Sequence, residues 1–298
     1  MKSFTYQNRR KKDYFEGWYT RLVDIENNIN IAVIFALTKN ELDPHAFIQV
    51  YDGVELTNKY FRFDIREFSF SNEVSIGDNL LSPSNLKLDV DNYKIDVVFE
   101  KQVPIKKYLG FDSAMSYLKL FPLVCFQEVN IIDGKYKGSI QIKDVIDKSI
   151  GNIYMEKTYG YKFPKKWIWI QGNHFNNNLK LSFSVGYIPL LGKYRKGFFA
   201  VLHSEGKEYR FGSFNLSRIK INKKTDEKVE IIIRKGRYKL LIEATTKNPV
   251  ILVGPVDGGE MILEVFESIN SNVVVKLYKK SKLICSGTDN LAGFEYMY

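Results

Sequence analysis

The stretch YMEKTYGYKFPKKWIWIQGNHF, Tyr154–Phe175, is the most informative part of the sequence because it combines two tryptophans with closely spaced amide side chains. Its tryptophans, Trp167 and Trp169, lie two positions apart, so on a β-strand both side chains share one face. Gln171 and Asn173 continue that face, and the intervening residues lie on the other. Two indoles and two amides are costly to bury without partners. This face is therefore either used for binding or closely paired.

Alternation of apolar and polar residues with a period of two runs through most of the chain. Residues 60–68 (YFRFDIREF) and 179–187 (LKLSFSVGY) are examples. Many short segments of this kind, without a confident long helix, predict an all-β fold of antiparallel strands. Because the number of strands is large, two barrel-like units are favoured over one. We place the boundary next to the opening stretch, which gives an N-terminal unit of residues 1–150 and a C-terminal unit of 151–298.

Local turn signals refine this interpretation. Asp133-Gly134 lies between two strand-like segments, 124–132 and 135–143, and predicts a hairpin there. Asp91-Asn92 predicts another. Residues 113–120 (SAMSYLKL) are the one segment expected to form a short helix.

Composition limits the class of protein. The chain has 298 residues, of which 45% are hydrophobic and 14% aromatic, enough for a real core. The net charge is +10, a sign that suits contact with an anionic membrane surface or nucleic acid. The basic residues are mostly scattered, and no motif for reading bases occurs. We therefore expect no nucleic-acid partner and retain peripheral membrane contact.

Cysteine usage and the N-terminal sequence both bear on the cellular compartment in which the protein is expected. Two cysteines, Cys125 and Cys285, provide no disulfide framework. The first residues, MKSFTYQNRRKKDYF, lack the apolar run of a signal peptide, and no window approaches the roughly 18 apolar residues of a membrane span. We expect a soluble, cytoplasmic protein, and the oligomeric state stays open.

Several familiar catalytic motifs are absent from the sequence. Neither GxGxxG, GxxxxGK[ST] nor GxSxG occurs. The histidines His45, His174 and His203 stand alone, without the close His/Cys/Asp groups that hold zinc. No metal site is therefore expected.

A second notable stretch, YFEGWY (Tyr14–Tyr19), places the carboxyl of Glu16 among aromatic residues. If Glu16 is buried there, its pKa rises and it could donate a proton near neutral pH. The alternative is that Glu16 forms a structural ion pair with a lysine or arginine. Glu156 and Lys157 are adjacent, so on a strand they lie on opposite faces and each needs its own partner.

Together, these two stretches resemble the tocopherol cyclase family. After YFEGWY, the pattern is Y-x-E-K-x-[aromatic]-G-x-x-F-P-x-x-W-x-W-x-Q-x-N-x-F. Its matching positions are Tyr154, Glu156, Lys157, Gly160, Phe163, Pro164, Trp167, Trp169, Gln171, Asn173 and Phe175. Further similarity lies in residues 184–191, 197–198 and 286–295, so the resemblance covers nearly the whole chain.

The resemblance implies two lipocalin-like β-barrel units and the cyclisation of a prenylated hydroquinone. Such a reaction protonates an isolated alkene and captures the resulting cation with the phenol oxygen. It needs a desolvated acid, an apolar cleft and aromatic faces near the cation. No metal or redox cofactor is needed.

Roles follow from the resemblance for ten residues. The catalytic candidates are Glu16, Glu156 and Lys157. The substrate-binding candidates are Trp18, Tyr19, Trp167, Trp169, Gln171, Asn173 and His174, with Tyr19 and His174 as further proton-handling candidates.

The sequence also departs from the family pattern. Tyr159 stands where the family usually has tryptophan. After Pro122 we expect a Glu and a His in related bacterial members, whereas the strand reads LVCFQEVN, with Cys125, Gln127 and Glu128. Two main hypotheses follow: an enzyme that cyclises or hydrates a lipophilic, prenylated substrate, or a non-catalytic lipocalin-like carrier or sensor. A structural protein that self-associates through its aromatic face is a third.

Overall fold

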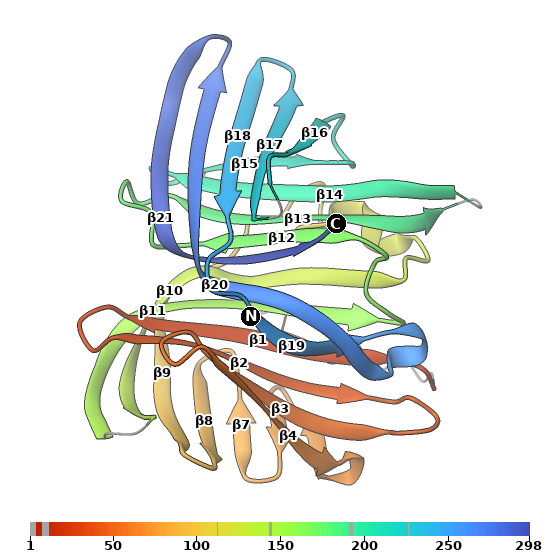
Figure 1. Ribbon diagram of the computed structural model, residues 1–298, viewed down its shortest axis with the longest axis vertical. Helices are drawn as coiled ribbons and strands as arrows, with labels where there is room; N and C mark the ends of the chain where they lie inside the picture. The colour runs from red at the N-terminus through yellow and green to blue at the C-terminus, as the bar shows by residue number, and fades with distance from the viewer. Residues whose placement is uncertain (1–3, 8–11, 112, 143–144, 191–192, 226) are drawn as a thin grey trace. The chain divides into compact units, whose positions relative to one another are not determined.

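The structure is a computed structural model that describes residues 4–7, 12–111, 113–142, 145–190, 193–225 and 227–298. The described residues form antiparallel strands connected by turns and by three short 3-10 helices (Figure 1). The predicted all-β fold of two lipocalin-like units is confirmed.

The two compact units are each assembled from separate parts of the chain. The first contains Met1–Pro104, Val124–Phe163 and Leu252–Glu264, and the second contains Ile105–Leu123, Pro164–Ile251 and Val265–Tyr298. The expected boundary at residue 150 lies inside strand β11 (Val145–Gly160), and all of β11 belongs to the first unit.

The sheet of the first unit is a meander whose first strand pairs with its last. Its elements are β1 (Phe15–Asp24), β2 (Ile29–Thr38), β3 (His45–Asp52), β4 (Thr57–Asp64), η1 (Ile65–Glu67), β5 (Phe68–Phe70), β6 (Val74–Ile76), β7 (Asn79–Leu81), β8 (Asn85–Val90), β9 (Tyr93–Val103), β10 (Cys125–Gln141) and β11. The strand order is β4-β3-β2-β1-β11-β10-β9-β8-β7-β6-β5. Because the two edge strands, β4 and β5, are linked through η1, the sheet curls into a nearly closed barrel (Figure 1).

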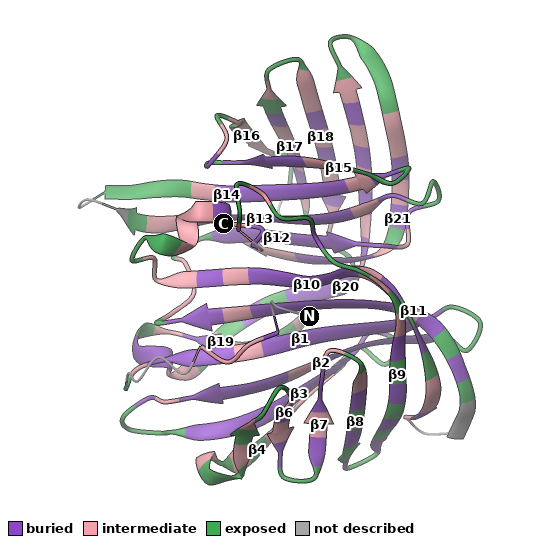
Figure 2. Ribbon diagram, turned by 180° about the vertical axis from the view of Figure 1, so that it is seen from behind, coloured by how far each residue is buried: buried purple, intermediate pink, exposed green. Residues whose placement is uncertain are grey.

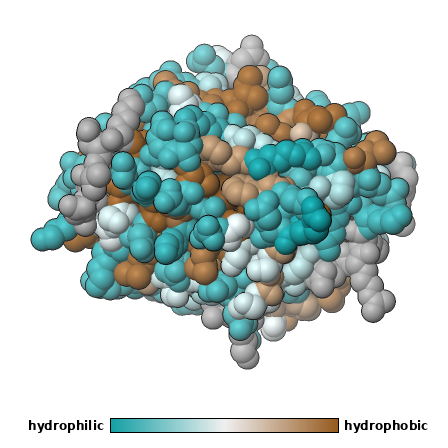
Figure 3. All heavy atoms as spheres, turned by 90° about the horizontal axis from the view of Figure 1, so that it is seen from below, coloured by the Kyte–Doolittle hydropathy of each residue, from teal (hydrophilic) through white to brown (hydrophobic). Residues whose placement is uncertain are grey.

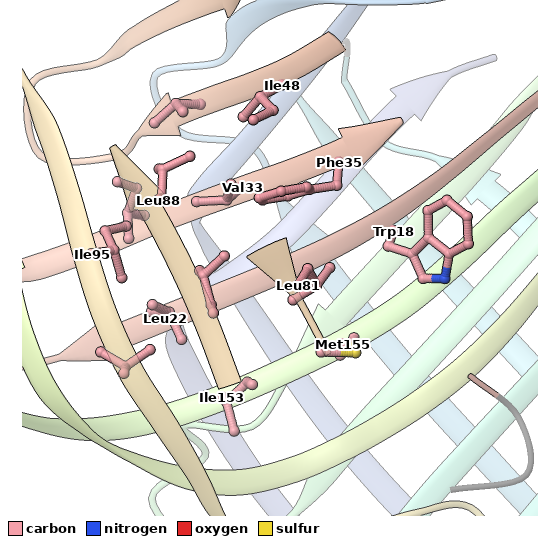
Figure 4. Close-up of a cluster of buried hydrophobic side chains, with 14 of the residues drawn as sticks. Trp18, Leu22, Val33, Phe35, Ile48, Leu81, Leu88, Ile95, Ile153 and Met155 are labelled. Atoms are coloured by element: carbon pink, nitrogen blue, oxygen red, sulfur yellow. The ribbon is translucent and has the colours of Figure 1, made fainter. Parts of the chain in front are cut away.

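Alternating side chains explain the interior of this barrel. Along β8 and β9, buried and more exposed residues alternate, as Figure 2 shows. The inward side chains form one apolar cluster. Figure 4 shows its members converging from β1, β2, β3, β8, β9 and β11, with Trp18 toward one end. Burial of this cluster is the main source of stability of the first unit.

The second unit contains a similar antiparallel sheet, in which the first strand, β12, also pairs with the last, β21. Its elements are η2 (Ser116–Leu120), β12 (Trp167–Gly172), β13 (Lys180–Leu190), β14 (Lys193–Ser204), β15 (Lys207–Gly212), β16 (Arg218–Lys223), β17 (Lys228–Lys235), β18 (Tyr238–Thr245), β20 (Met261–Lys279) and β21 (Lys282–Met297). The strand order is β15-β14-β13-β12-β21-β20-β18-β17-β16, and β19 (Val250–Pro255), followed by η3 (Asp257–Gly259), pairs with β20. Residues 252–264 of this hairpin belong to the first unit. Ile168 and Ile170 lie in the second apolar cluster.

One local prediction is wrong, and two others are confirmed, one of them only in part. Asp133-Gly134 does not form a hairpin turn, because β10 continues through it and the pairing with both neighbouring strands shifts register there. Neither residue has the positive φ that a tight Asp-Gly turn requires. A Cβ on Gly134 would lie 2.9 Å from Ile153 Cγ2, so this glycine permits close approach within a bulge. Residues 113–120 form only the five-residue 3-10 helix η2. The hairpin at Asp91-Asn92, between β8 and β9, is confirmed.

Candidate functional site

The first barrel contains a buried ionic cluster at the end where Trp18 lies. Register pairs Lys157 of β11 with Trp18 of β1 on one side and with Glu128 of β10 on the other. Glu16 lies two residues before Trp18, so its side chain is on the same inner face. Three neighbouring strands thus direct two carboxyl groups and one amine into the barrel.

Lys157 is at the centre of the cluster. Its Nζ lies 3.0 Å from Glu16 Oε1 and 3.7 Å from Glu128 Oε2. It also donates a hydrogen bond to the Thr5 carbonyl, at 2.7 Å, and lies 4.8 Å from the centre of the Tyr159 ring. Since the side chain of Lys157 is completely buried, these contacts replace the water that an ammonium group would otherwise hold.

Glu16 is completely buried as well. The Tyr14 hydroxyl donates to its Oε2 at 2.7 Å, and the backbone N–H of Gln7 donates to the same carboxyl at 3.1 Å. Burial raises the pKa of Glu16 above its ordinary value, although Lys157 and Tyr14 act in the opposite direction. Burial also raises the pKa of Tyr14, and the charge of Glu16 adds to that effect.

Aromatic rings enclose the space beside this carboxyl. The Trp18 indole stacks against Phe68 and Phe70, with centroid distances of 6.3 and 6.1 Å. Phe4 and Tyr6, which precede the sheet in sequence, lie 6.1 and 6.4 Å from Trp18. The buried Trp18 Nε1 has no hydrogen-bond partner among the described residues. The surroundings are therefore apolar and aromatic, apart from the ionic cluster and one unused N–H donor.

Two further candidates of the first unit lie on the outer face of the same sheet. Tyr19 and Glu156 are opposite each other in the β1–β11 register and are both buried. Glu156 accepts a hydrogen bond from Gln127 Nε2, at 2.8 Å, and another from the Tyr154 hydroxyl. As expected from their adjacency, Glu156 and Lys157 have separate partners on opposite faces.

The remaining candidates belong to the second unit. Trp167, Trp169 and Gln171 lie on the face of β12 opposite to the apolar cluster, and all are buried. Trp167 Nε1 donates to Glu295, and Gln171 Nε2 donates to Asn173 Oδ1 at 3.1 Å.

The rest of this group has partners on β21. A Cβ on Gly293 would lie 2.7 Å from the Trp169 ring, so this glycine makes room for the indole. The backbone N–H of His174 donates to Asp289 at 2.9 Å. Trp167, Gln171 and the backbone of His174 are thus hydrogen-bonded within their own unit.

Inside the first unit, the candidates fall into two groups on opposite faces of the sheet, and the other five candidates belong to the second unit. Glu16, Trp18 and Lys157 come together inside the first barrel. For Glu16, the contact with Lys157 is the ion pair of the alternative interpretation.

Sequence reasoning gave no site role to Tyr14, Glu128 or Tyr159, which also line the cluster; the Tyr159 hydroxyl donates to Glu128 at 3.3 Å. The charge of Glu128 within an apolar strand segment was the available signal.

The chain matches a known protein family. The family described as tocopherol cyclase-like matches residues 106–296, almost two thirds of the sequence. The chain belongs to the tocopherol cyclase-like family. The match includes Glu128, Glu156 and Lys157, whereas Glu16 and Trp18 lie before it. None of the curated proteins matches the chain.

Solved structures similar to this tocopherol cyclase-like protein share its fold. A protein described as a putative AttH from Nitrosomonas europaea is 11% identical, with a TM-score of 0.55 over 95% of this chain and 93% of its own. Kievitone hydratase from Nectria haematococca is 13% identical, with a TM-score of 0.52 over 95% and 88%. CghA, solved with Sch210972, is 9% identical, with a TM-score of 0.61 over 96% and 89%. At these identities the likeness concerns the fold.

Within the described ranges, no group of three or more His, Cys, Asp or Glu side chains is placed to hold a metal ion. In the same part of the chain, no helix is long and apolar enough to span a membrane.

Proposed function

We propose that this tocopherol cyclase-like protein is an enzyme that protonates a carbon–carbon double bond of a lipophilic, prenylated substrate and then closes a ring or adds water. The observation that supports this proposal is the buried carboxyl of Glu16, whose pKa burial raises, beside the Trp18 indole in an apolar barrel. A carboxyl whose pKa is raised by burial can serve as the acid that alkene protonation needs.

The proposed reaction conserves atoms and charge. The Glu16 carboxyl transfers its proton to the less substituted alkene carbon, which leaves a tertiary carbocation and the Glu16 carboxylate. The ring of Trp18 stabilises the cation through its π face. The phenol oxygen of the substrate, or a water molecule, then forms the C–O bond, and its proton returns to Glu16. Cyclisation is therefore an isomerisation, and hydration consumes one water.

Lys157 and Tyr14 take supporting roles in this proposal. Both contact Glu16 directly, at 3.0 and 2.7 Å, and both stabilise its carboxylate after the proton has left. Both contacts also act to lower the pKa of Glu16.

The substitution Glu16→Gln tests the proposal because it retains shape and removes the acid. With prenylated hydroquinones as substrates, we expect a loss of turnover of at least about a hundredfold and ligand affinity within a few-fold of the original. Turnover of the unmodified enzyme should fall as the pH rises through the pKa of Glu16. Glu156→Gln, on the outer face, is the matched control and should retain turnover. Equal turnover in both variants would contradict the assignment.

A non-catalytic carrier is the second candidate. The ion pair between Glu16 and Lys157, completely buried on both sides, favours it, since a charge held this way can have a purely structural role. A carrier would bind the same hydroquinones without forming any product, and Glu16→Gln would leave that behaviour unchanged.

We further propose peripheral contact with an anionic membrane surface, where a lipophilic substrate would reside. The support comes from one end of the second unit, where Leu120, Phe121 and Tyr194 are 70%, 46% and 53% exposed. The exposed cations beside Tyr194 are Lys193, Arg195 and Lys196. We call these six residues the basic rim.

The two parts of the basic rim lie at the same end of the unit. The Tyr117 hydroxyl of η2 donates to the Phe214 carbonyl, and the neighbouring Ser213 N–H donates to Phe198 of β14. No Asp or Glu occurs in residues 113–125 or 187–197. Hydrophobic side chains also reach the surface elsewhere, among hydrophilic ones, as on the face in Figure 3. The proposal is therefore supported by the combination of exposed apolar and basic side chains in the basic rim.

A further inference from the structure

Residues Phe4–Gln7 lie inside the end of the first barrel that carries the Glu16 cluster. Phe4 is 5% exposed and belongs to the apolar cluster of the barrel. The ring of Tyr6 packs edge-on against Phe68, with 5.2 Å between centroids. This short segment thus places two aromatic rings against the walls of the proposed site.

The backbone of the same segment satisfies the ionic cluster. The Thr5 carbonyl accepts from Lys157 Nζ at 2.7 Å, and the Gln7 N–H donates to Glu16 at 3.1 Å. The backbone therefore supplies one acceptor and one donor next to two rings, and the Thr5 hydroxyl adds a longer contact with Lys157 Nζ, at 3.3 Å. A phenol hydroxyl on an apolar molecule has the same combination, because it accepts and donates through one oxygen.

The segment does not provide a hydrogen-bond partner for the indole nitrogen of Trp18. Trp18 Nε1 is buried and has no hydrogen-bond partner among the described residues. A buried donor without a partner costs free energy. The segment therefore satisfies Glu16 and Lys157 while leaving a donor that a ligand oxygen could use.

We propose that Phe4–Gln7 is an internal occupant of the ligand site, and that a ligand with a hydroxylated aromatic ring and an apolar tail binds by displacing it. The inference rests on the proposed function in so far as both use the Glu16 site. It adds that the free protein is autoinhibited by its own segment and that the ligand's ring, as well as its tail, is recognised within the first barrel. Binding and displacement are then one equilibrium, and the apparent affinity is reduced by the fraction of molecules in which the segment is in place.

Weakening the segment tests this competition. The probe is a decyl-substituted hydroquinone, and its affinity is measured by calorimetry with the full chain. For the double variant Phe4→Ala/Tyr6→Ala we expect binding tighter by about tenfold or more, because two rings no longer hold the segment. Tyr161→Ala, which removes a 44% exposed ring of the same unit, is the control and should bind as the unmodified chain does. Unchanged or weaker binding by the double variant would overturn the proposal.

A second test uses an engineered disulfide, so that it does not depend on whether the double variant folds. In a chain with Cys125→Ser and Cys285→Ser, the pair Tyr6→Cys/Phe68→Cys is oxidised to tie the segment to β5. We expect oxidation to weaken probe binding by at least about tenfold and reduction to restore it. Equal binding in both redox states would refute displacement. Because affinity is the readout, the result is independent of turnover: a chain that binds but does not react refutes the enzyme proposal and leaves this one standing.

Discussion

Replacing Lys157 by Met is the sharpest test of the buried cluster. Methionine keeps an unbranched apolar stem of similar length and removes the ammonium group. Lys157 and Glu16 are both completely buried, with 3.0 Å between Nζ and Oε1, and Glu128 lies 3.7 Å away. Removing one partner of a buried pair leaves an uncompensated charge and typically costs about 3–5 kcal/mol. We expect a loss of this size in the free energy of unfolding at pH 8.

The loss should depend on pH. Burial already raises the pKa of Glu16 above its ordinary value, and without Lys157 the main opposing charge is gone. A carboxyl with a raised pKa holds its proton more tightly in the folded state than in the unfolded one. Its contribution is therefore most favourable below the ordinary pKa, and stability falls as the pH rises toward the raised pKa. The slope is about 1.4 kcal/mol per pH unit for one proton. At pH 5 the variant should lose markedly less than at pH 8.

The assay is urea unfolding at both pH values, followed by tryptophan fluorescence. Trp18 lies in the first unit, and the other two of the three tryptophans lie in the second. In a background with Trp167→Phe and Trp169→Phe, fluorescence reports on the unit that carries the cluster. Adding Glu16→Gln to Lys157→Met should recover part of the loss at pH 8. A loss that is equal at pH 5 and pH 8, or one that Glu16→Gln increases, would refute the reasoning.

Two further predictions concern the backbone and the surface. Gly160 has φ +153°, and a Cβ there would lie 2.3 Å from the Val124 carbonyl oxygen, so Gly160→Ala should lower the melting temperature of the first unit severely. In contrast, Gly206→Ala, where a Cβ meets nothing within 4 Å, should cost only about 1 kcal/mol for its positive φ; similar melting temperatures would contradict this. For the basic rim, the double variant Leu120→Ser/Phe121→Ser should reduce co-sedimentation with phosphatidylglycerol vesicles several-fold, whereas Leu42→Ser, at a 91% exposed leucine of the first unit, should not. Equal binding to neutral phosphatidylcholine vesicles, or equal effects of both variants, would count against the membrane proposal.

Local periodicity was sufficient for the fold class, because alternation of side chains is a property of each strand by itself. The Asp133-Gly134 prediction failed for the opposite reason. Whether Asp-Gly turns the chain or forms a bulge depends on the partner strands, here β9 and β11, on which Gly134 is closely packed. That information is distant in sequence.

The candidate site was predictable only in part for a similar reason. The sequence indicated that Glu16 needs either a cation or a protonated state, and the structure supplies Lys157 from β11, which is distant in sequence but pairs directly with β1. The faces of each strand were predictable as well, so the separation of Glu156 from Lys157 was expected. Which barrel each strand joins was not fully predictable: the expected boundary puts Glu156 and Lys157 in the second unit, whereas β11 belongs to the first. Thr5 and Gln7 act through backbone atoms, which no residue pattern marks.

The pairing of β12 with β21 sets the order in which the second sheet can be completed. β12 pairs with β13 on one side and with β21 on the other. In the chain, β12 and β21 are separated by residues 173–281. During synthesis, the edge of Trp167–Gly172 that pairs with β21 is exposed until that late strand emerges. An apolar strand edge in this state is a template for pairing with other chains. Translation pauses or truncations before Lys282 should therefore turn this strand, with its two tryptophans, into an aggregation hazard.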